Sequence, residues 1–260
     1  MTERRSWQVL TSGHLQFIAL VTMTVDHVGA LLLPQQDFLR IIGRLAFPLY
    51  CLMIAEGFSH TADRKKYFAR LMAFAIVSVV PFGIFEFLMT EAPLLWSVFA
   101  ELFLEELLGN VIFELALGFG VLWVLSKGKL GWLAVPAGMI LSEMLDLMYG
   151  WYGIAMIVCF YVFRDRRDLQ AVSAAVLTVA FSYATVLLAF IRYYTELSLG
   201  RLLLRAAVRI TGYVQTAAVF AAAPILLYNG ERGRRMPRYL GYAYYPGHLL
   251  VLDLLYIFFH

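Results

Sequence analysis

Residues 15–33 read LQFIALVTMTVDHVGALLL and form the first long apolar stretch of the chain. At ~1.5 Å of rise per residue, a helix over such a stretch is long enough to cross the hydrocarbon core of a bilayer. The stretch nevertheless contains Asp26 and His27 side by side. An ionisable side chain in hydrocarbon costs roughly 2.5–3.5 kcal/mol on insertion scales, so such residues usually face a polar interior and act there. The sequence therefore predicts a membrane-spanning helix that carries either a structural ion pair or a proton-transfer site.

The composition of the chain is that of an integral membrane protein. Of its 260 residues, 62% are hydrophobic and 15% are charged, whereas soluble domains average about 45–50% apolar and ~25% charged residues. The basic residues flank the apolar runs and do not form one stripe, which argues against nucleic acid as a partner. Cys51 and Cys159 fall inside apolar runs and are interpreted as small core residues. Since the sequence has no histidine and cysteine cluster with metal-ligand spacing, no metal is expected.

The apolar runs have the length of helices, and they predict an all-α, polytopic transmembrane helical bundle that forms a single domain over residues 1–260. About nine spans are expected. They cover residues 14–33, 38–58, 71–89, 110–126, 130–147, 149–163, 169–191, 207–228 and 239–259. Residues 91–109 mix acidic and apolar residues, with Glu101 and Glu105 on one helical face. We expect this segment to lie along the membrane interface.

The distribution of basic residues predicts the orientation of the bundle. With the N-terminus inside, the inner segments contain Arg4 and Arg5 and the basic groups at 64–70, 127–129, 164–167 and 232–238. The outer segments contain the acidic pieces at 91–109 and 143–148 and one basic group at 192–209. Because Lys and Arg are enriched in cytoplasmic loops, the N-terminus is expected inside and the C-terminus outside. No small-residue cleavage site follows the first apolar run, so that run is expected to be a retained helix.

Asp26 and His27 cannot share one face of a helix, because consecutive residues point about 100° apart. Asp26 therefore needs a partner from another helix, and Arg40 or Arg44 in the next span is the predicted one. The two arginines are spaced i, i+4 and lie on one face. His27 would then be free to point into a cavity as a general base. A structural alternative for Arg40 is that its side chain reaches the membrane interface.

Several further residues have both a functional and a structural interpretation. His248 follows Pro246 inside the last span and is either a catalytic group or a hydrogen-bonded packing residue. Glu56 is at the inner end of the second span and is either a site residue or interfacial. Asn110 either binds a ligand or caps the helix that follows it. Tyr245 belongs either to the site or to the aromatic belt at the interface.

The basic loop with Arg64, Lys65 and Lys66 is first of all a topology signal. It also suits a phosphate-bearing donor from the cytosol. Composition and spacing alone leave open whether the chain is an enzyme or a transporter.

The chain resembles the TraX family of membrane N-acetyltransferases, known for acetylating the amino terminus of conjugative pilin. The resemblance is collinear along most of the chain and strongest in its first sixty residues. The blocks that carry it are at 18–29, 39–49, 55–58, 64–71, 110–113, 149–153 and 244–249. The resemblance implies acetyl-CoA as donor, an amine as acceptor, and the bacterial cytoplasmic membrane as location.

The two interpretations together predict a mechanism. Acetyl-CoA would enter from the inner side, with its phosphates near Arg64, Lys65 and Lys66 and its thioester in a polar cavity between the first, second and last spans. His27 would accept a proton from the acceptor, which is a pilin or another envelope molecule. Arg44, with Arg40, would stabilise the oxyanion or fix Asp26, and His248 would orient the thioester or share the proton. Glu56, Asn110 and Tyr245 complete the candidate site.

Three other functions remain open from the sequence, and one of them is a pilus or secretion assembly factor without catalysis. An O-acetyltransferase of an envelope glycan or lipid would use the same site, because a hydroxyl acceptor also needs a base. A proton-coupled transporter would use Asp26, His27 and His248 as a relay. The transporter alternative is weakened because the sequence contains no internal repeat.

Overall fold

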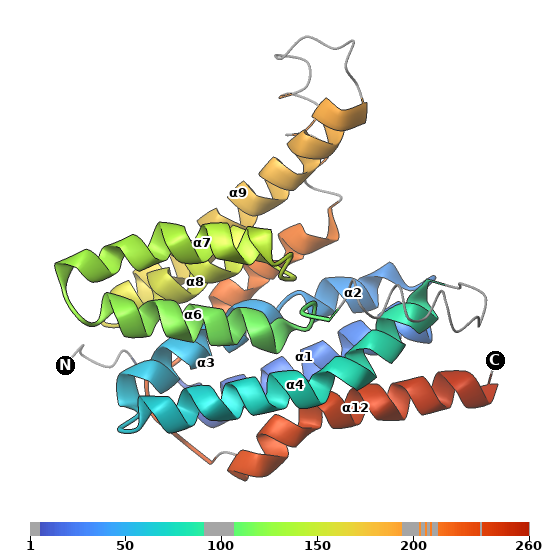
Figure 1. Cartoon of the computed structure of the whole chain (residues 1–260), viewed down its shortest axis with the longest axis horizontal. Helices are drawn as coiled ribbons and strands as arrows, with labels where there is room; N and C mark the ends of the chain where they lie inside the picture. The colour runs from blue at the N-terminus through green and yellow to red at the C-terminus, as the bar shows by residue number, and fades with distance from the viewer. Residues whose placement is uncertain are drawn as a thin grey trace.

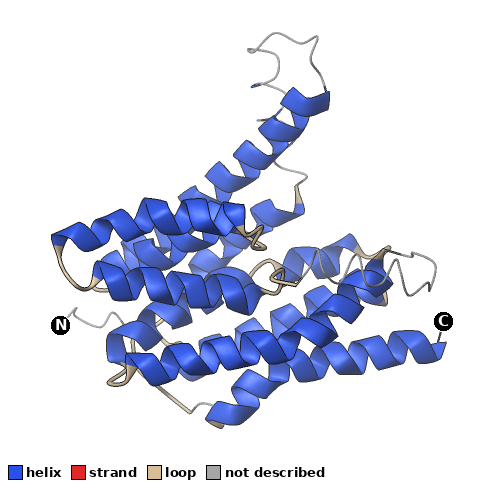
Figure 2. Ribbon diagram, in the orientation of Figure 1, coloured by secondary structure: helices blue, strands red, loops and turns tan. Residues whose placement is uncertain are grey.

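The computed structural model describes residues 6–90, 107–193, 203, 206, 209, 213–234 and 236–259. Within these ranges the chain forms α-helices and short 3₁₀ helices and no β-strand, as the uniform colouring of Figure 2 shows. The all-α class predicted from the apolar runs is therefore confirmed for this part of the chain.

Most helices lie side by side in one bundle, and the C-terminal part of α9 extends away from it (Figure 1). In chain order the elements are α1 (Ser12–Leu31), α2 (Asp37–Gly43), α3 (Ala46–His60), α4 (Arg64–Met89), α6 (Val111–Leu125), the 3₁₀ helix η1 (Lys129–Leu133), α7 (Ala134–Met144), α8 (Gly150–Val162), α9 (Arg167–Tyr193), the 3₁₀ helix η3 (Val214–Ala221), α11 (Ala222–Leu227) and α12 (Arg238–Phe259).

Each predicted span coincides with one helix or with two consecutive helical pieces. Among the described residues, four segments are long and apolar enough to cross a membrane: Ser12–Leu31, Asp37–His60, Arg64–Met89 and Arg167–Arg192. Shorter apolar helices cover Val111–Leu125, Gly150–Val162 and Val214–Leu227. The helical membrane character is thus supported, while the count of nine spans and their orientation stay predictions. The predicted interfacial segment falls mostly on residues 91–106, which lie outside the described residues.

The second predicted span is not continuous. It breaks at Arg44 and Leu45, between α2 and α3. The physical cause is Pro48 in the first turn of α3. Proline has no N–H to donate to the carbonyl four residues earlier, and its ring clashes with that carbonyl, which here belongs to Arg44. The break lets α2 take its own direction and pack against α1.

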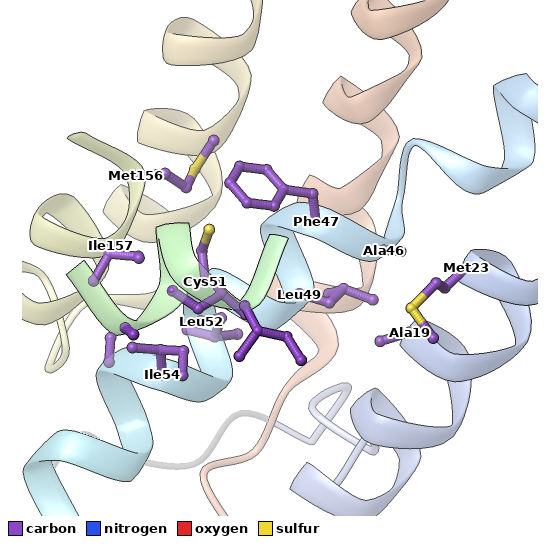
Figure 3. Close-up of a cluster of buried hydrophobic side chains, with 14 of the residues drawn as sticks. Ala19, Met23, Ala46, Phe47, Leu49, Cys51, Leu52, Ile54, Met156 and Ile157 are labelled. Carbon is purple, nitrogen blue, oxygen red and sulfur yellow. The ribbon is translucent and has the colours of Figure 1, made fainter. Parts of the chain in front are cut away.

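The apolar core gathers around α3, which packs against α1, α6 and α8. Figure 3 shows this cluster, with Leu49, Cys51 and Leu52 of α3 between side chains of α1 and α8. Cys51 is fully buried in it, as expected for a small core residue. Within the core, Phe58 meets Phe119 edge to face, with 5.2 Å between the ring centroids. This packing holds the centre of the bundle together through ordinary burial of apolar surface.

Consecutive spans run in opposite directions, so loops from different parts of the chain meet at each end of the bundle. Arg64 at the start of α4 donates to Ser126 Oγ at the end of α6 over 3.0 Å. The N–H of Gly13 in α1 donates to the carbonyl of Arg232, which precedes α12, over 3.1 Å. We call this the basic end, formed by residues 61–66, 126–129, 163–167 and 229–234. The opposite end, where α1 and α4 finish and α3 begins, holds the polar cluster described next.

Candidate functional site

Asp26 contacts Arg40 of α2 and Arg44 directly after it. Arg44 Nη2 donates to Asp26 Oδ1 and Oδ2 over 2.6 and 2.8 Å. Arg40 Nη1 donates to Asp26 Oδ2 over 3.1 Å and to the Asp26 carbonyl over 3.3 Å. The structure thus uses both partners between which the sequence left a choice. Charge-assisted bonds of this kind are among the strongest in proteins, because a planar guanidinium matches a carboxylate.

A close approach of two helices makes this cluster possible. Gly43 of α2 lies directly against the Asp26 side chain, and Gly29 of α1 lies against Leu39, so a Cβ at either glycine would collide with its neighbour. Arg44 is also held by its Nε, which donates to the Arg40 carbonyl over 3.3 Å. These contacts place both guanidinium groups on the face of α2 that meets α1.

Gln215 of η3 is a further member of the cluster. Its Oε1 accepts a hydrogen bond of 3.2 Å from Arg44 Nη1. Its Nε2 is buried and has no hydrogen-bond partner among the described residues. The sequence analysis did not select Gln215. The signal that could have found it is an amide side chain inside the apolar run 213–228.

The His27 side chain contacts the last helix. His27 Nδ1 lies 2.7 Å from His248 Nε2, and the two ring planes differ by 13° with their centroids 4.9 Å apart, so the rings meet edge to edge. His248 Nδ1 in turn lies 2.8 Å from the carbonyl oxygen of Tyr244. On the same helix face, Thr24 Oγ1 and the Tyr244 hydroxyl are 2.7 Å apart. The His27–His248 and Thr24–Tyr244 contacts therefore join α1 to α12 at two points about one helical turn apart.

A cavity of about 290 Å³ opens beside these groups. Asp26, His27, Arg40 and Arg44 all line it. Its other polar lining residues are Tyr50, Glu86, Tyr149, Tyr213, Gln215 and Tyr245, and apolar side chains such as Phe82 and Phe85 complete the wall. Cavities with a mostly apolar wall and a few converging polar groups are typical of small-molecule sites. His248 is not among the lining residues and lies behind His27.

Tyr245 is the one secondary candidate that joins the cavity. Its ring is buried and lies 6.3 Å from the His27 ring, centroid to centroid. Glu86, Tyr50 and Tyr213 also line the cavity but were not selected from the sequence. Their spacing along the chain carries no sign that their helices meet, so only the packing of the bundle identifies them.

Asn110 and Glu56 have structural partners away from the cavity. Asn110 caps α6, since its Oδ1 accepts from Ile112 N over 3.2 Å and its Nδ2 donates to the Ala75 carbonyl over 3.1 Å. Glu56 forms an ion pair of 2.8 Å with Arg167 at the basic end. Neither residue lines the cavity.

The basic group Arg64, Lys65 and Lys66 is also distant from the cavity. It starts α4, whereas Phe82 and Phe85 line the cavity near the end of that helix. At ~1.5 Å per residue, Arg64 and Phe82 are separated by roughly 27 Å along the helix axis. Arg64 stacks on Phe58, with its guanidinium carbon 4.3 Å from the ring centroid, and both lysines are exposed. The structure therefore distributes the predicted site residues over two ends of the bundle.

The described residues include no group of three or more histidine, cysteine and acidic side chains that could hold a metal ion. The polar groups that line the cavity are an imidazole, a carboxylate with two guanidinium groups, the Glu86 carboxylate, the Gln215 amide and several phenols. Such groups can transfer a proton and stabilise a developing negative charge.

Comparison with known proteins gives a consistent result. The family model described as "TraX protein" matches residues 12–256. The chain is 28% identical over 257 residues to "Probable fimbrial assembly protein FimC, serogroup H1" of Dichelobacter nodosus, with 92% of each chain covered. It is 26% identical over 173 residues to "Protein TraX" of Escherichia coli, which covers 64% of this chain and 62% of the relative. No solved structure matches the chain significantly. Because the family model covers nearly the whole sequence, the chain belongs to the TraX family.

Proposed function

We propose that the protein is a membrane-embedded acetyltransferase that moves an acetyl group from acetyl-CoA to an amine on an envelope acceptor, such as the N-terminus of a pilin. The observation that carries this proposal is the position of His27. Its imidazole lines a cavity next to a carboxylate with two guanidinium groups. The family supports the direction of the proposal, since one relative bears the name of a fimbrial assembly protein.

His27 acts as the general base in this proposal. The acceptor amine attacks the thioester carbonyl, the new C–N bond forms, and His27 takes the proton that the amine nitrogen loses. The C–S bond then breaks, and the proton returns to the departing thiolate, which leaves as the free thiol of coenzyme A. A positioned base of this kind contributes typically 10²–10⁴-fold to the rate.

Arg40 is the better placed of the two arginines to stabilise the oxyanion that forms on the thioester carbonyl. Arg44 already donates hydrogen bonds to Asp26, Gln215 and the Arg40 carbonyl. Arg40 contacts Asp26 through Nη1 alone, and its side chain is 33% exposed. A guanidinium carries five N–H donors, so Arg40 keeps donors for a ligand in the cavity. In this proposal Arg44 and Asp26 hold Arg40 in place.

The predicted contact between the donor phosphates and the basic loop has to be compared with the distance between the two ends of the bundle. Acetyl-CoA that touched Arg64, Lys65 and Lys66 with its phosphates would need to span roughly 27 Å to bring its thioester to the cavity. We therefore assign to these exposed residues the attraction of the anionic donor, which depends on charge and not on contact geometry. Glu56, paired with Arg167, contributes to the structure of the same end.

The test uses the purified protein in lipid nanodiscs with acetyl-labelled acetyl-CoA. Three acceptors are compared: a peptide with a free N-terminus, the same peptide with a blocked N-terminus, and a hydroxyl-bearing glycan. The proposal predicts label on the free peptide alone. Label on the glycan alone would contradict the amine acceptor and identify the protein as an O-acetyltransferase. Failure to bind acetyl-CoA, together with proton-coupled uptake in proteoliposomes, would contradict the proposal and favour a transporter.

A further inference from the structure

The contacts of the two histidines determine where their protons lie. A backbone carbonyl oxygen accepts hydrogen bonds and never donates them. His248 Nδ1, at 2.8 Å from the Tyr244 carbonyl oxygen, must therefore carry a hydrogen. In a neutral imidazole one nitrogen is a donor and the other an acceptor. His248 Nε2 is then the acceptor.

The same reasoning continues to His27. Its Nδ1 is 2.7 Å from His248 Nε2, so the hydrogen in this contact belongs to His27 Nδ1. His27 Nε2 consequently bears a lone pair and no hydrogen. No described residue forms a hydrogen bond with this nitrogen. Because His27 lines the cavity and His248 lies behind it, Nε2 is the nitrogen that remains for a ligand.

A second contact between the helices keeps this arrangement in register. Thr24 Oγ1 donates its hydrogen to the Leu20 carbonyl over 2.9 Å, so in the 2.7 Å contact with Tyr244 the phenol hydroxyl is the donor. Thr24 and His27 lie on neighbouring turns of α1, as Tyr244 and His248 do on α12. A shift of α12 along α1 would break both contacts together.

We infer that His248 is a positioning residue that holds His27 as the Nδ1–H tautomer and thereby makes His27 Nε2 the basic nitrogen of the cavity. Its effect on catalysis rests on the proposed acetyl transfer, whereas the tautomer itself does not. When Nε2 accepts a proton, Nδ1 keeps its hydrogen bond to His248 Nε2, so the imidazolium is stabilised without any rearrangement. A histidine here fills the place that a carboxylate occupies behind the base in many hydrolases.

The test combines nitrogen-15 NMR with a matched pair of variants. Histidine-labelled protein in nanodiscs is compared with His248→Gln, whose amide oxygen can still accept from His27 Nδ1, and with His248→Phe, which keeps an aromatic ring but has no acceptor. The His27 resonances are assigned by their loss in His27→Ala. We expect a protonated Nδ1 and an unprotonated Nε2 for His27 in the wild type and in His248→Gln, and loss of this tautomer preference in His248→Phe.

Turnover is measured on the same samples. By comparison with hydrogen-bond partners that orient catalytic or metal-bound histidines elsewhere, His248→Phe should lower kcat roughly 10–100-fold with KM unchanged, and His248→Gln should restore most of it. A wild-type His27 with its hydrogen on Nε2 would overturn the inference, as would equal turnover in the two variants. A wild type with the expected tautomer but no acetyl transfer would overturn the proposed function and leave the tautomer assignment intact.

Discussion

The two ends of the bundle use charged residues in different ways. At the cavity end, Asp26 and Arg44 are paired across two helices with side chains only 12% and 15% exposed. At the basic end, Arg166 and Asp168 are paired within three residues of sequence, with side chains 61% and 44% exposed. Isolated pairs at an exposed site contribute little, because water and salt screen them. Removal of one partner from a buried pair leaves an uncompensated charge.

The comparison distinguishes charged residues at the basic end, which need no precise geometry, from those at the cavity end, which are held in one. The predicted inner location of the basic residues depends on their charge alone, and so does the proposed attraction of an anionic donor. The cavity-end charges are expensive to bury, and the cluster borders a cavity with a histidine in its wall. The following predictions test this contrast, from the largest expected effect on stability or activity to the smallest.

Asp26→Ala should be the most damaging of these substitutions. It leaves Arg40 and Arg44 without their carboxylate, and the loss of one partner of a buried pair typically destabilises by about 3–5 kcal/mol. The measurement is thermal unfolding of the protein in detergent. The matched control is Asp168→Ala at the basic end, for which we expect no change in Tm. Equal Tm values for both variants would remove the distinction between the two ends.

Gly43→Ala tests the close approach of α2 to α1. The added Cβ collides with the Asp26 side chain, and such overpacking costs typically about 1–3 kcal/mol. The control is Gly247→Ala in α12, where a Cβ meets no atom within 4 Å. Because alanine favours helix over glycine, this control should hold or raise the Tm. A Gly43→Ala protein as stable as the control would mean that the two helices are less tightly packed than described.

Asp253→Leu compares two buried acids: Asp26, which is paired with arginines, and Asp253, which has no hydrogen-bond partner among the described residues. Asp253 in α12 is 2% exposed, and neither carboxylate oxygen has a hydrogen-bond partner among the described residues. Replacement of an unsatisfied polar group by an apolar one of similar size should stabilise the protein by about 1–2 kcal/mol. The Tm should therefore rise, in the opposite direction to Asp26→Ala. A fall in Tm would indicate that Asp253 has a partner.

The triple substitution of Arg64, Lys65 and Lys66 by alanine should have the smallest effect. If these residues only attract the anionic donor, kcat stays unchanged while KM for acetyl-CoA rises about threefold at low salt, an effect at the low end of electrostatic steering. The difference from the wild type should vanish as salt screens the charges. Loss of kcat would show instead that these residues touch the donor during the reaction.

The sequence predicted those features that depend on local pattern. Helix-length apolar runs located nearly every helix, and the cost of a buried acid led from Asp26 to the two arginines of the next span. Pro48 is also visible in the sequence, although its consequence, the break after Gly43, was not anticipated.

Features that depend on how distant helices pack were not predictable in this way. His27 and His248 are 221 residues apart, and the sequence analysis named both without placing them in contact. Glu86, Tyr213 and Gln215 reach the cavity because α4 ends and η3 begins beside α1 and α2. The distance between the cavity and the Arg64 group follows from the length of α4, which an analysis by motif does not consider.

The central claim is that His27 is the base at the cavity, and the kcat of His27→Ala in nanodiscs tests it most directly. His60→Ala is the matched control, since His60 is exposed at the end of α3 and distant from the cavity. The account predicts that His27→Ala keeps the Tm of the wild type to within a few degrees, while its kcat for acetyl transfer falls at least about 10²-fold. His60→Ala should retain full activity. A folded His27→Ala protein with wild-type turnover would contradict the account.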